Sequence, residues 1–261
     1  MSQNFDTNQN YYLFNKKNSI PIVFIHGVGL NREMWSPQIS YFKNYSTITY
    51  DLLGHGKTPF DKKKIEMKDF IDQLLYLIKY LKLEKINLVG FSIGSLIALN
   101  FASDYQEKLK SLTLIATTYK RDDKQRREVI DRVNLAKANQ PISKLALKRW
   151  FTDKYLEQNP DIYDQFMKIL TKKPQDQQNF IKAYEFFANY QDDIQKIKKI
   201  KTKTLIMTGS NDPGSTPYMS KNLAEDLENS TFQEIKNAKH LCSIECADDV
   251  NININKFIKN D

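Results

Sequence analysis

The sequence has little cysteine and little glycine, and each shortage excludes some classes of protein. Its 261 residues include two cysteines, too few for the disulfide framework of a small secreted domain. Glycine makes up about 3% of the chain, against the usual ~7%. This composition excludes collagen-like chains, and the 41% hydrophobic content argues against intrinsic disorder.

Long apolar runs are also missing. No segment approaches the ~20 consecutive apolar residues that a membrane-spanning helix needs. The polar residues 1–6 lack the basic and apolar regions of a secretory signal peptide. We therefore expect a cytoplasmic globular protein that does not bind a membrane. Its length suits one α/β domain that carries an insertion.

The eight glycines fall in four pairs, and each pair follows a short apolar run. These runs, at residues 22–25, 46–50, 86–89 and 204–207, are typical of strands buried on both faces of a parallel sheet. The pairs are Gly27 and Gly29, Gly54 and Gly56, Gly90 and Gly94, and Gly209 and Gly214. Helical periodicity between the runs, as over residues 70–81, predicts a mostly parallel, doubly wound sheet. In such a sheet, ligands bind at the carboxyl ends of the strands, where these glycines lie.

Residues 119–199 follow a different pattern. They contain no glycine and no convincing strand, but they include helical patches such as 129–138 and 142–151. We predict that this segment forms a helical cap inserted between two strands of the sheet. Residues 1–118 and 200–261 would then form the core domain.

The excess positive charge of the chain lies in the insertion. The formal net charge is +8, and residues 117–203 carry 20 basic and 12 acidic side chains. The remainder of the chain is therefore neutral. Positively charged helices above a site would raise the local concentration of an anionic substrate. Such a substrate could be a carboxylate-bearing lactone, or an acyl group on an acyl carrier protein with an acidic surface. Alternatively, the basic helices only keep the surface soluble.

The segment Gly90-Phe91-Ser92-Ile93-Gly94 is the sharpest chemical signal. It matches the pattern G-x-S-x-G, and it lies between an apolar run and a helical pattern. In that context the serine occupies a tight strand-to-helix turn, and small flanking residues prevent clashes around it. We predict that Ser92 is a nucleophile.

A serine nucleophile needs a base, and the chain has three histidines. His26 and His55 lie inside glycine turns, where we expect structural roles. His240 follows the last apolar run and is the predicted base. Asp212, at the end of another predicted strand, is the acid expected to orient the imidazole. The chain order Ser92, Asp212, His240 differs from the two other common triad orders.

Acyl transfer also needs donors for the negative oxygen of the tetrahedral intermediate. The amide of Ile93, directly after the nucleophile, is one predicted donor. The second is expected from the loop at residues 26–29, most simply the amide of Val28.

These motifs together resemble the α/β-hydrolase superfamily over the whole chain outside the insertion. They are His26-Gly27-Val28-Gly29-Leu30, Met34-Trp35, Asp51-Leu52-Leu53-Gly54-His55-Gly56, Gly90 to Gly94, Asp212 and His240. Within the superfamily, Arg149-Trp150-Phe151-Thr152 and Lys239-His240-Leu241 followed by Glu245 resemble 3-oxoadipate enol-lactonases. The resemblance implies an α/β-hydrolase fold and a serine hydrolase that cleaves a small carboxylic ester or lactone through an acyl-enzyme.

Five residues are candidates for binding the substrate. Trp35, Trp150, Phe151 and Leu241 could line the pocket, although each also fits an ordinary core position. Arg149 is the candidate partner for a carboxylate of the substrate.

We expect no cofactor, no metal ion and no nucleic acid. His240, Cys242 and Cys246 lack a fourth ligand at regular spacing, so a metal site is not predicted. Gly27-Val28-Gly29 lacks the third glycine of a dinucleotide site, because Arg32 occupies its place. Basic and aromatic residues do not alternate as they do in nucleic-acid-binding surfaces. The expected partner is a small, anionic ester or lactone.

Three other functions remain open. One is a carboxylesterase for a carrier-bound acyl chain, similar to pimeloyl-acyl carrier protein methyl ester esterase. Another is a hydrolase of carbon–carbon bonds, for which the same triad could serve. The third is a ligand-binding protein that retains the hydrolase-like fold without turnover.

Overall fold

The computed structural model describes residues 2–140, 142–170 and 174–259, and one sheet of eight strands organises them. The strand order is β1-β2-β4-β3-β5-β6-β7-β8. The strands are β1 (Ser2–Phe5), β2 (Tyr11–Asn15), β3 (Ile22–Ile25), β4 (Thr47–Tyr50), β5 (Ile86–Phe91), β6 (Leu109–Ile115), β7 (Thr204–Gly209) and β8 (Ser230–Ile235). All neighbours from β4 to β8 in this order pair in parallel, which confirms the predicted α/β class.

The central strands coincide with the apolar runs of the sequence. β3, β4, β5 and β7 are buried along their whole length, as expected of strands that are covered on both faces. The sequence pattern does not predict β1 and β2, which pair antiparallel at one edge of the sheet. β1 is largely polar and neither strand precedes a glycine pair, so the signal that marks the other strands is absent there.

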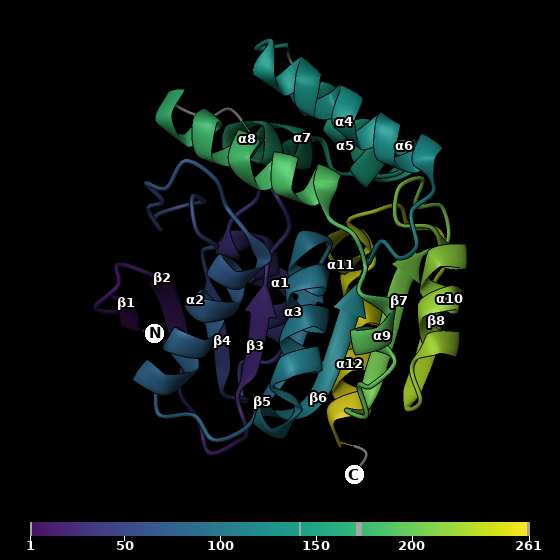
Figure 1. Cartoon of the computed structure of the whole chain (residues 1–261). Coiled ribbons are helices and arrows are strands. Elements are labelled where there is room, and N and C mark those ends of the chain that lie inside the picture. Colours follow the sequence, from purple (N-terminus) through teal and green to yellow (C-terminus); the bar gives the residue numbers. More distant parts are fainter. Residues whose placement is uncertain (1, 141, 171–173, 260–261) are drawn as a thin grey trace.

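Helices cover both faces of the sheet (Figure 1). On one face, α2, α3 and α10 contribute Leu74, Leu99 and Leu223 to a hydrophobic core. On the other face, α11 and α12 contribute Cys242 and Val250 to a second core. The helices of the core domain are α1 (Ser36–Tyr41), α2 (Met67–Tyr80), α3 (Ile93–Asp104), α9 (Ile194–Ile197), α10 (Pro217–Asp226), α11 (Cys242–Glu245) and α12 (Ala247–Lys259), with the 3-10 helices η1 (Arg32–Trp35) and η2 (Gln106–Lys108).

A second layer of helices lies above the carboxyl ends of the strands (Figure 1). Its members are α4 (Asp123–Lys137), α5 (Ile142–Trp150), α6 (Asp153–Gln158), α7 (Pro160–Leu170) and α8 (Pro174–Asn189). In the chain they all lie between β6 and β7, inside the predicted cap at residues 119–199. That range also contains α9, which packs against α3 of the core.

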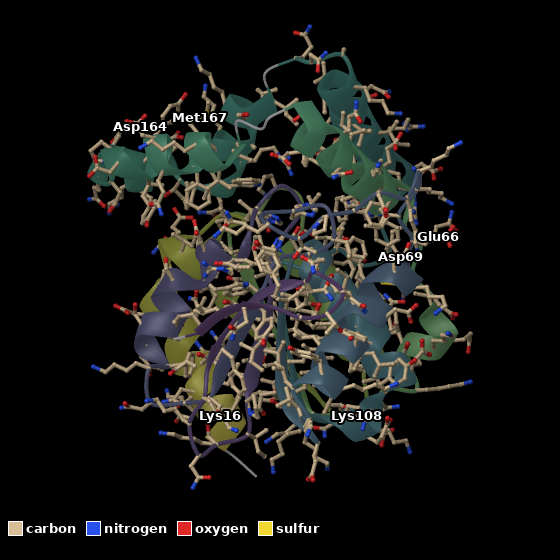
Figure 2. The ribbon with its side chains drawn as sticks, turned by 90° about the vertical axis from the view of Figure 1, so that its left-hand side faces the viewer. Lys16, Glu66, Asp69, Lys108, Asp164 and Met167 are labelled. Atoms are coloured by element: carbon tan, nitrogen blue, oxygen red, sulfur yellow. The ribbon has the colours of Figure 1, made fainter. Side chains whose placement is uncertain are left out.

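Charged side chains lie on the outside of both layers. Figure 2 shows Lys16 and Lys108 at the end of the molecule away from the cap, and Asp164 on the outer layer. Glu66 and Asp69 begin α2 with a capping box, in which each side chain accepts a hydrogen bond from the backbone amide of the other residue. Charged side chains thus lie at the surface, whereas apolar side chains pack against the two faces of the sheet.

The turn from β5 to α3 is tightly packed near the centre of the sheet. Ser92 has a φ of 55°, in the left-handed region that costs a non-glycine residue about 1–3 kcal/mol. A Cβ atom on Gly90 would lie 2.3 Å from the carbonyl oxygen of Gly94, and one on Gly94 would lie 2.4 Å from the carbonyl oxygen of Ile25. The two glycines therefore allow the turn to press against its own helix and against β3.

We predict that Gly94→Ala destabilises the protein by about 1–3 kcal/mol, because the new methyl group would meet backbone atoms that cannot move aside. Chemical denaturation monitored by circular dichroism measures the change. Gly214→Ala is the matched control, since its nearest neighbour would be the mobile end of Arg149, 3.1 Å away. Equal stability of the two variants would contradict the tight packing of the turn.

Candidate active site

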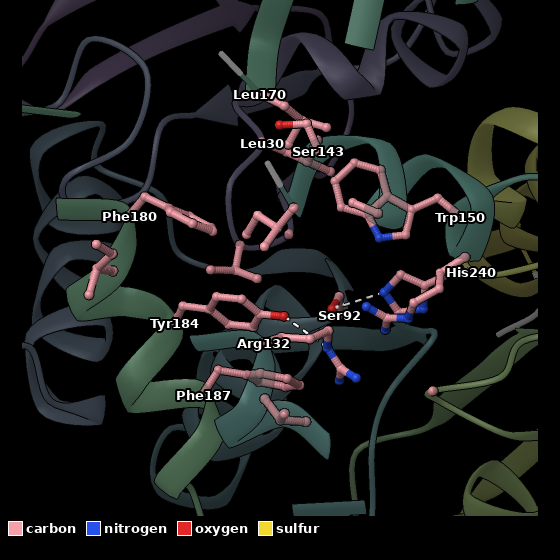
Figure 3. A pocket seen from close by; sticks show the side chains of 18 of the residues that line it. Leu30, Ser92, Arg132, Ser143, Trp150, Leu170, Phe180, Tyr184, Phe187 and His240 are labelled. Atoms are coloured by element: carbon pink, nitrogen blue, oxygen red, sulfur yellow. Dashed lines mark hydrogen bonds between the residues drawn. The ribbon is translucent and has the colours of Figure 1, made fainter. Parts of the chain in front are cut away.

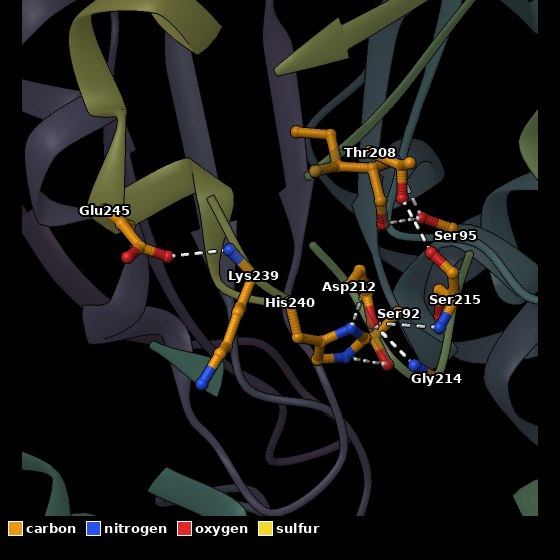
Figure 4. Close-up of polar contacts among 10 residues, drawn as sticks. Ser92, Ser95, Thr208, Asp212, Gly214, Ser215, Lys239, His240 and Glu245 are labelled. Atoms are coloured by element: carbon orange, nitrogen blue, oxygen red, sulfur yellow. Dashed lines mark hydrogen bonds and ion pairs between the residues drawn. The ribbon is translucent and has the colours of Figure 1, made fainter. Parts of the chain in front are cut away.

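Ser92, His240 and Asp212 form one hydrogen-bonded chain, although they belong to three separate segments (Figure 4). Nδ1 of His240 lies 2.7 Å from Oδ2 of Asp212, and Nε2 of His240 lies 3.2 Å from Oγ of Ser92. With Nδ1 protonated and bonded to the carboxylate, Nε2 presents its lone pair to the hydroxyl. All three residues are more than nine-tenths buried. This arrangement suits transfer of the Ser92 proton to His240.

The loop after β7 fixes the orientation of Asp212. Its Oδ1 atom accepts hydrogen bonds from the amides of Gly214 at 2.8 Å and Ser215 at 3.0 Å. The carbonyl oxygen of Ser215 in turn accepts a hydrogen bond from Oγ1 of Thr208 at 2.9 Å (Figure 4). The other carboxylate oxygen is thereby directed at the imidazole of His240.

The other two histidines brace the neighbouring loops. Nε2 of His26 accepts a hydrogen bond from the amide of Leu52 at 2.9 Å, and Nε2 of His55 accepts one from the amide of Gly29 at 3.1 Å. Each ring therefore ties the loop after β3 to the loop after β4. These contacts agree with the structural roles expected from the sequence.

The two backbone amides predicted to bind an oxyanion, those of Ile93 and Val28, are free to donate hydrogen bonds. Ile93 begins α3, so its amide is one of the first-turn amides that have no partner within the helix. Val28 lies in the loop after β3 and lines the same cavity as Ser92. Across the described residues, neither amide donates a hydrogen bond.

A cavity of about 990 Å³ opens above Ser92, between the ends of the strands and the cap. Figure 3 shows Ser92 and His240 at its base, with Trp150 and Tyr184 projecting from cap helices. Its volume is at the upper end of the range typical of small-molecule sites. The cavity therefore has room for a substrate that carries substituents beyond the reacting bond.

The structure divides the five predicted substrate-binding residues. Arg149 and Trp150 line the cavity. Trp35, Phe151 and Leu241 are not among its described lining residues, and each is fully buried in the hydrophobic core. Phe151, for example, stacks on the ring of a neighbouring cap tyrosine at a centroid distance of 5.3 Å. These three residues therefore occupy ordinary core positions, which is the alternative that the sequence left open.

Glu245 connects the cap to the segment that carries His240. Its carboxylate accepts hydrogen bonds from the amide of Lys239 at 2.8 Å and from the amide of Thr152 at 2.9 Å. The hydroxyl of Thr152 also bonds to it, and the amide of Leu241 donates to the carbonyl oxygen of Trp150 at 3.0 Å. The residues on both sides of His240 are thus linked to residues 150–152 of the cap, one directly and the other through Glu245. The sequence drew attention to Glu245 through a motif, without indicating this contact.

We expect Glu245→Gln to lower the free energy of unfolding by about 1–3 kcal/mol. The NH2 group of the glutamine would face a backbone N–H donor on one side of the contact, leaving part-buried donors unpaired. Thermal and urea denaturation measure the loss. Glu228→Gln, an exposed acid in the core domain, provides the control and should leave stability unchanged. A variant at Glu245 as stable as this control would show that the link does not hold the two parts together.

Metal-binding and membrane-spanning features are absent from the described residues. No cluster of three or more histidine, cysteine, aspartate or glutamate side chains in them could hold a metal ion. No helix among them is long and apolar enough to cross a membrane. Cys242 and Cys246 are free thiols, and burial raises the pKa of Cys242 far above its usual range.

Comparisons with known proteins agree with this geometry. A family model described as "alpha/beta hydrolase fold" matches residues 20–246. The chain is 30% identical to (E)-2-((N-methylformamido)methylene)succinate hydrolase of Acinetobacter baylyi, over 94% of this chain and 92% of that protein. It is 26% identical to 3-oxoadipate enol-lactonase 2 of the same organism, over 92% and 89% of the two chains. The solved structure of an enol-lactonase from Burkholderia xenovorans has the same fold, with a TM-score of 0.87, 22% identity and coverage of 96% and 97%.

Proposed function

Because this chain belongs to the alpha/beta hydrolase family, we propose that it is a serine hydrolase that cleaves a small, anionic carboxylic ester or lactone through an acyl-enzyme. The observation that carries the proposal is the hydrogen-bonded chain of Ser92, His240 and Asp212 at the base of the cavity. The likeness to two relatives named as hydrolases of carboxylate-bearing compounds supports the same conclusion.

The first half of the reaction forms the acyl-enzyme. His240 takes the proton of Ser92 through Nε2 while Oγ attacks the carbonyl carbon of the substrate. Asp212 stabilises the imidazolium that results, through the 2.7 Å bond to Nδ1. The amides of Val28 and Ile93 donate hydrogen bonds to the oxygen that becomes negative in the tetrahedral intermediate. His240 then gives its proton to the leaving oxygen, and the carbon–oxygen bond to the leaving group breaks.

The second half releases the acid and restores the enzyme. A water molecule takes the place of the leaving group and gives a proton to Nε2 of His240 as it attacks the acyl carbon. The ester bond to Ser92 breaks, and the serine recovers its proton from His240. With an enol leaving group, conversion of the enol to the ketone would help to draw the first step forward.

The charge of the cavity favours an anionic substrate. Five of its described lining side chains are lysine or arginine, and one, Glu128, is acidic. Arg149 is half-buried, and burial lowers its pKa. A carboxylate on the substrate would compensate that desolvated charge, since arginine binds carboxylates through paired hydrogen bonds.

We predict that a fluorophosphonate probe labels the wild-type protein and does not label Ser92→Ala. The variant should also lose at least about 10³-fold in hydrolytic activity, because it lacks the nucleophile. In-gel fluorescence and an assay with a p-nitrophenyl ester measure the two effects. Ser143→Ala, which removes another hydroxyl from the wall of the cavity, should keep both labelling and activity. If wild-type protein is not labelled, the chain is a binding protein with a hydrolase-like fold.

The excess positive charge on the cap also fits an acyl ester that is bound to an acidic carrier protein. The salt dependence of the activity distinguishes such a substrate from a small ester or lactone. We expect activity on a small ester or lactone to change less than about twofold between 50 and 300 mM salt, because a half-buried charge is weakly screened. Binding of an acidic carrier protein would weaken much more steeply as the salt concentration rises. Steady-state rates on a p-nitrophenyl ester, a lactone and a carrier-bound methyl ester, measured at several salt concentrations, test this. Turnover of the carrier substrate alone would reverse the assignment.

A further inference from the structure

Two arginine side chains and one tyrosine of the cap line the same cavity. Nε of Arg132, on α4, donates a hydrogen bond to the hydroxyl oxygen of Tyr184 at 3.1 Å. The side chain of Arg149, on α5, lines the same cavity and lies close enough to Tyr184, which extends from α8, for the two groups to interact electrostatically. Figure 3 shows Arg132 and Tyr184 joined in the cavity beside Ser92. Three cap helices therefore contribute one polar side chain each to a single cluster.

Neither guanidinium group has an acidic partner. Within the described residues, no carboxylate lies within 4.0 Å of either Arg132 or Arg149, the distance of an ion pair. Glu128, one helical turn before Arg132, lines the cavity but does not reach that distance. Asp212 attracts Arg149 from further away, but its two oxygens are taken by the triad and by its own loop.

The other positive side chains of the cavity have different environments. Arg121 donates from Nη2 to the carbonyl oxygens of Phe187 and Tyr190, so it ties the start of the cap to α8. Lys137 forms an ion pair with Glu185. Lys144 is exposed to solvent at the rim. Among the described lining residues, Arg132 and Arg149 are thus the two half-buried cations that have neither an acidic partner nor a backbone carbonyl partner.

Two positive charges in one part-buried cluster repel each other, and this repulsion affects the pKa of Arg149. The pKa of Arg149 is lowered first by burial and next by the positive charge of Arg132. Tyr184 supplies an acceptor but no negative charge. An arrangement of this kind is stabilised when anionic groups enter between the two cations.

We propose that Arg132 and Arg149 form a subsite for two carboxylates, so that the preferred substrate carries two negative charges besides its reacting carbonyl group. This inference rests on the proposed hydrolase function, and it adds a second recognition residue, Arg132, to the single arginine that the sequence indicated. Each guanidinium binds one carboxylate, and the hydroxyl of Tyr184 can donate to either. The acyl carbon is left free to face Ser92 at the base of the cavity.

The proposal is tested by binding without turnover. Ser92→Ala protein is titrated calorimetrically with malonate, succinate and glutarate, and with butyrate as the monocarboxylate of similar size to succinate. We expect at least one dicarboxylate to bind about 10-fold or more tightly than butyrate. Adding Arg132→Gln should reduce that preference to less than about 2-fold, while Arg132→Lys, which keeps the charge but not the planar fork, should retain part of it.

Lys148→Gln in the same background is the matched control, since it removes an exposed positive charge of α5 that is not among the described lining residues of the cavity. It should leave the preference for the dicarboxylate unchanged. Equal binding of mono- and dicarboxylates, no detectable binding of any of these acids, or the same loss in the Lys148 and Arg132 variants would overturn the proposal. Because turnover is not measured, these outcomes are separate from loss of fluorophosphonate labelling, which would overturn the hydrolase function itself.

Discussion

The site depends on one backbone constraint, the close contact of the β5–α3 turn with its own helix and with β3. That contact requires glycine at positions 90 and 94, where a side chain would meet carbonyl oxygens. It holds Ser92 at a φ of 55°, a conformation that the surrounding packing must enforce. The hydroxyl is thereby presented to His240, and the first amides of α3 are left free beside it. Relaxation of the turn would move the hydroxyl of Ser92 away from His240 and from the first amides of α3.

The core and the cap have different tasks in this arrangement. The carboxyl ends of β3, β5 and β7 and the loop before α11 supply the reacting groups. The cap supplies charge through Arg132 and Arg149 and covers the cavity. Glu245 and the backbone bond between Leu241 and Trp150 join the two layers next to His240. The cap and the segment that carries His240 are therefore connected through a short set of part-buried hydrogen bonds.

The sequence predicts the central sheet well and points to the three residues, Ser92, His240 and Asp212, that the fold joins by hydrogen bonds, because both follow from strong local patterns. Apolar runs followed by glycine pairs mark β3, β4, β5 and β7, and the three triad residues each lie just beyond a strand. The edge strands β1 and β2 carry no such pattern. Core and pocket positions also look alike in sequence, since a buried aromatic residue such as Phe151 satisfies both. Arg132 is one of many basic residues in the insertion, and only the fold brings it to Tyr184.

Rapid-quench mass spectrometry during turnover of a p-nitrophenyl ester directly tests whether an acyl-enzyme forms on Ser92. We expect a burst of about one p-nitrophenolate per protein molecule, together with a transient acyl group on the peptide that contains Ser92. The adduct should decay at the rate of steady-state turnover. Hydrolysis without any adduct, or an adduct located on a peptide that lacks Ser92, would contradict the account.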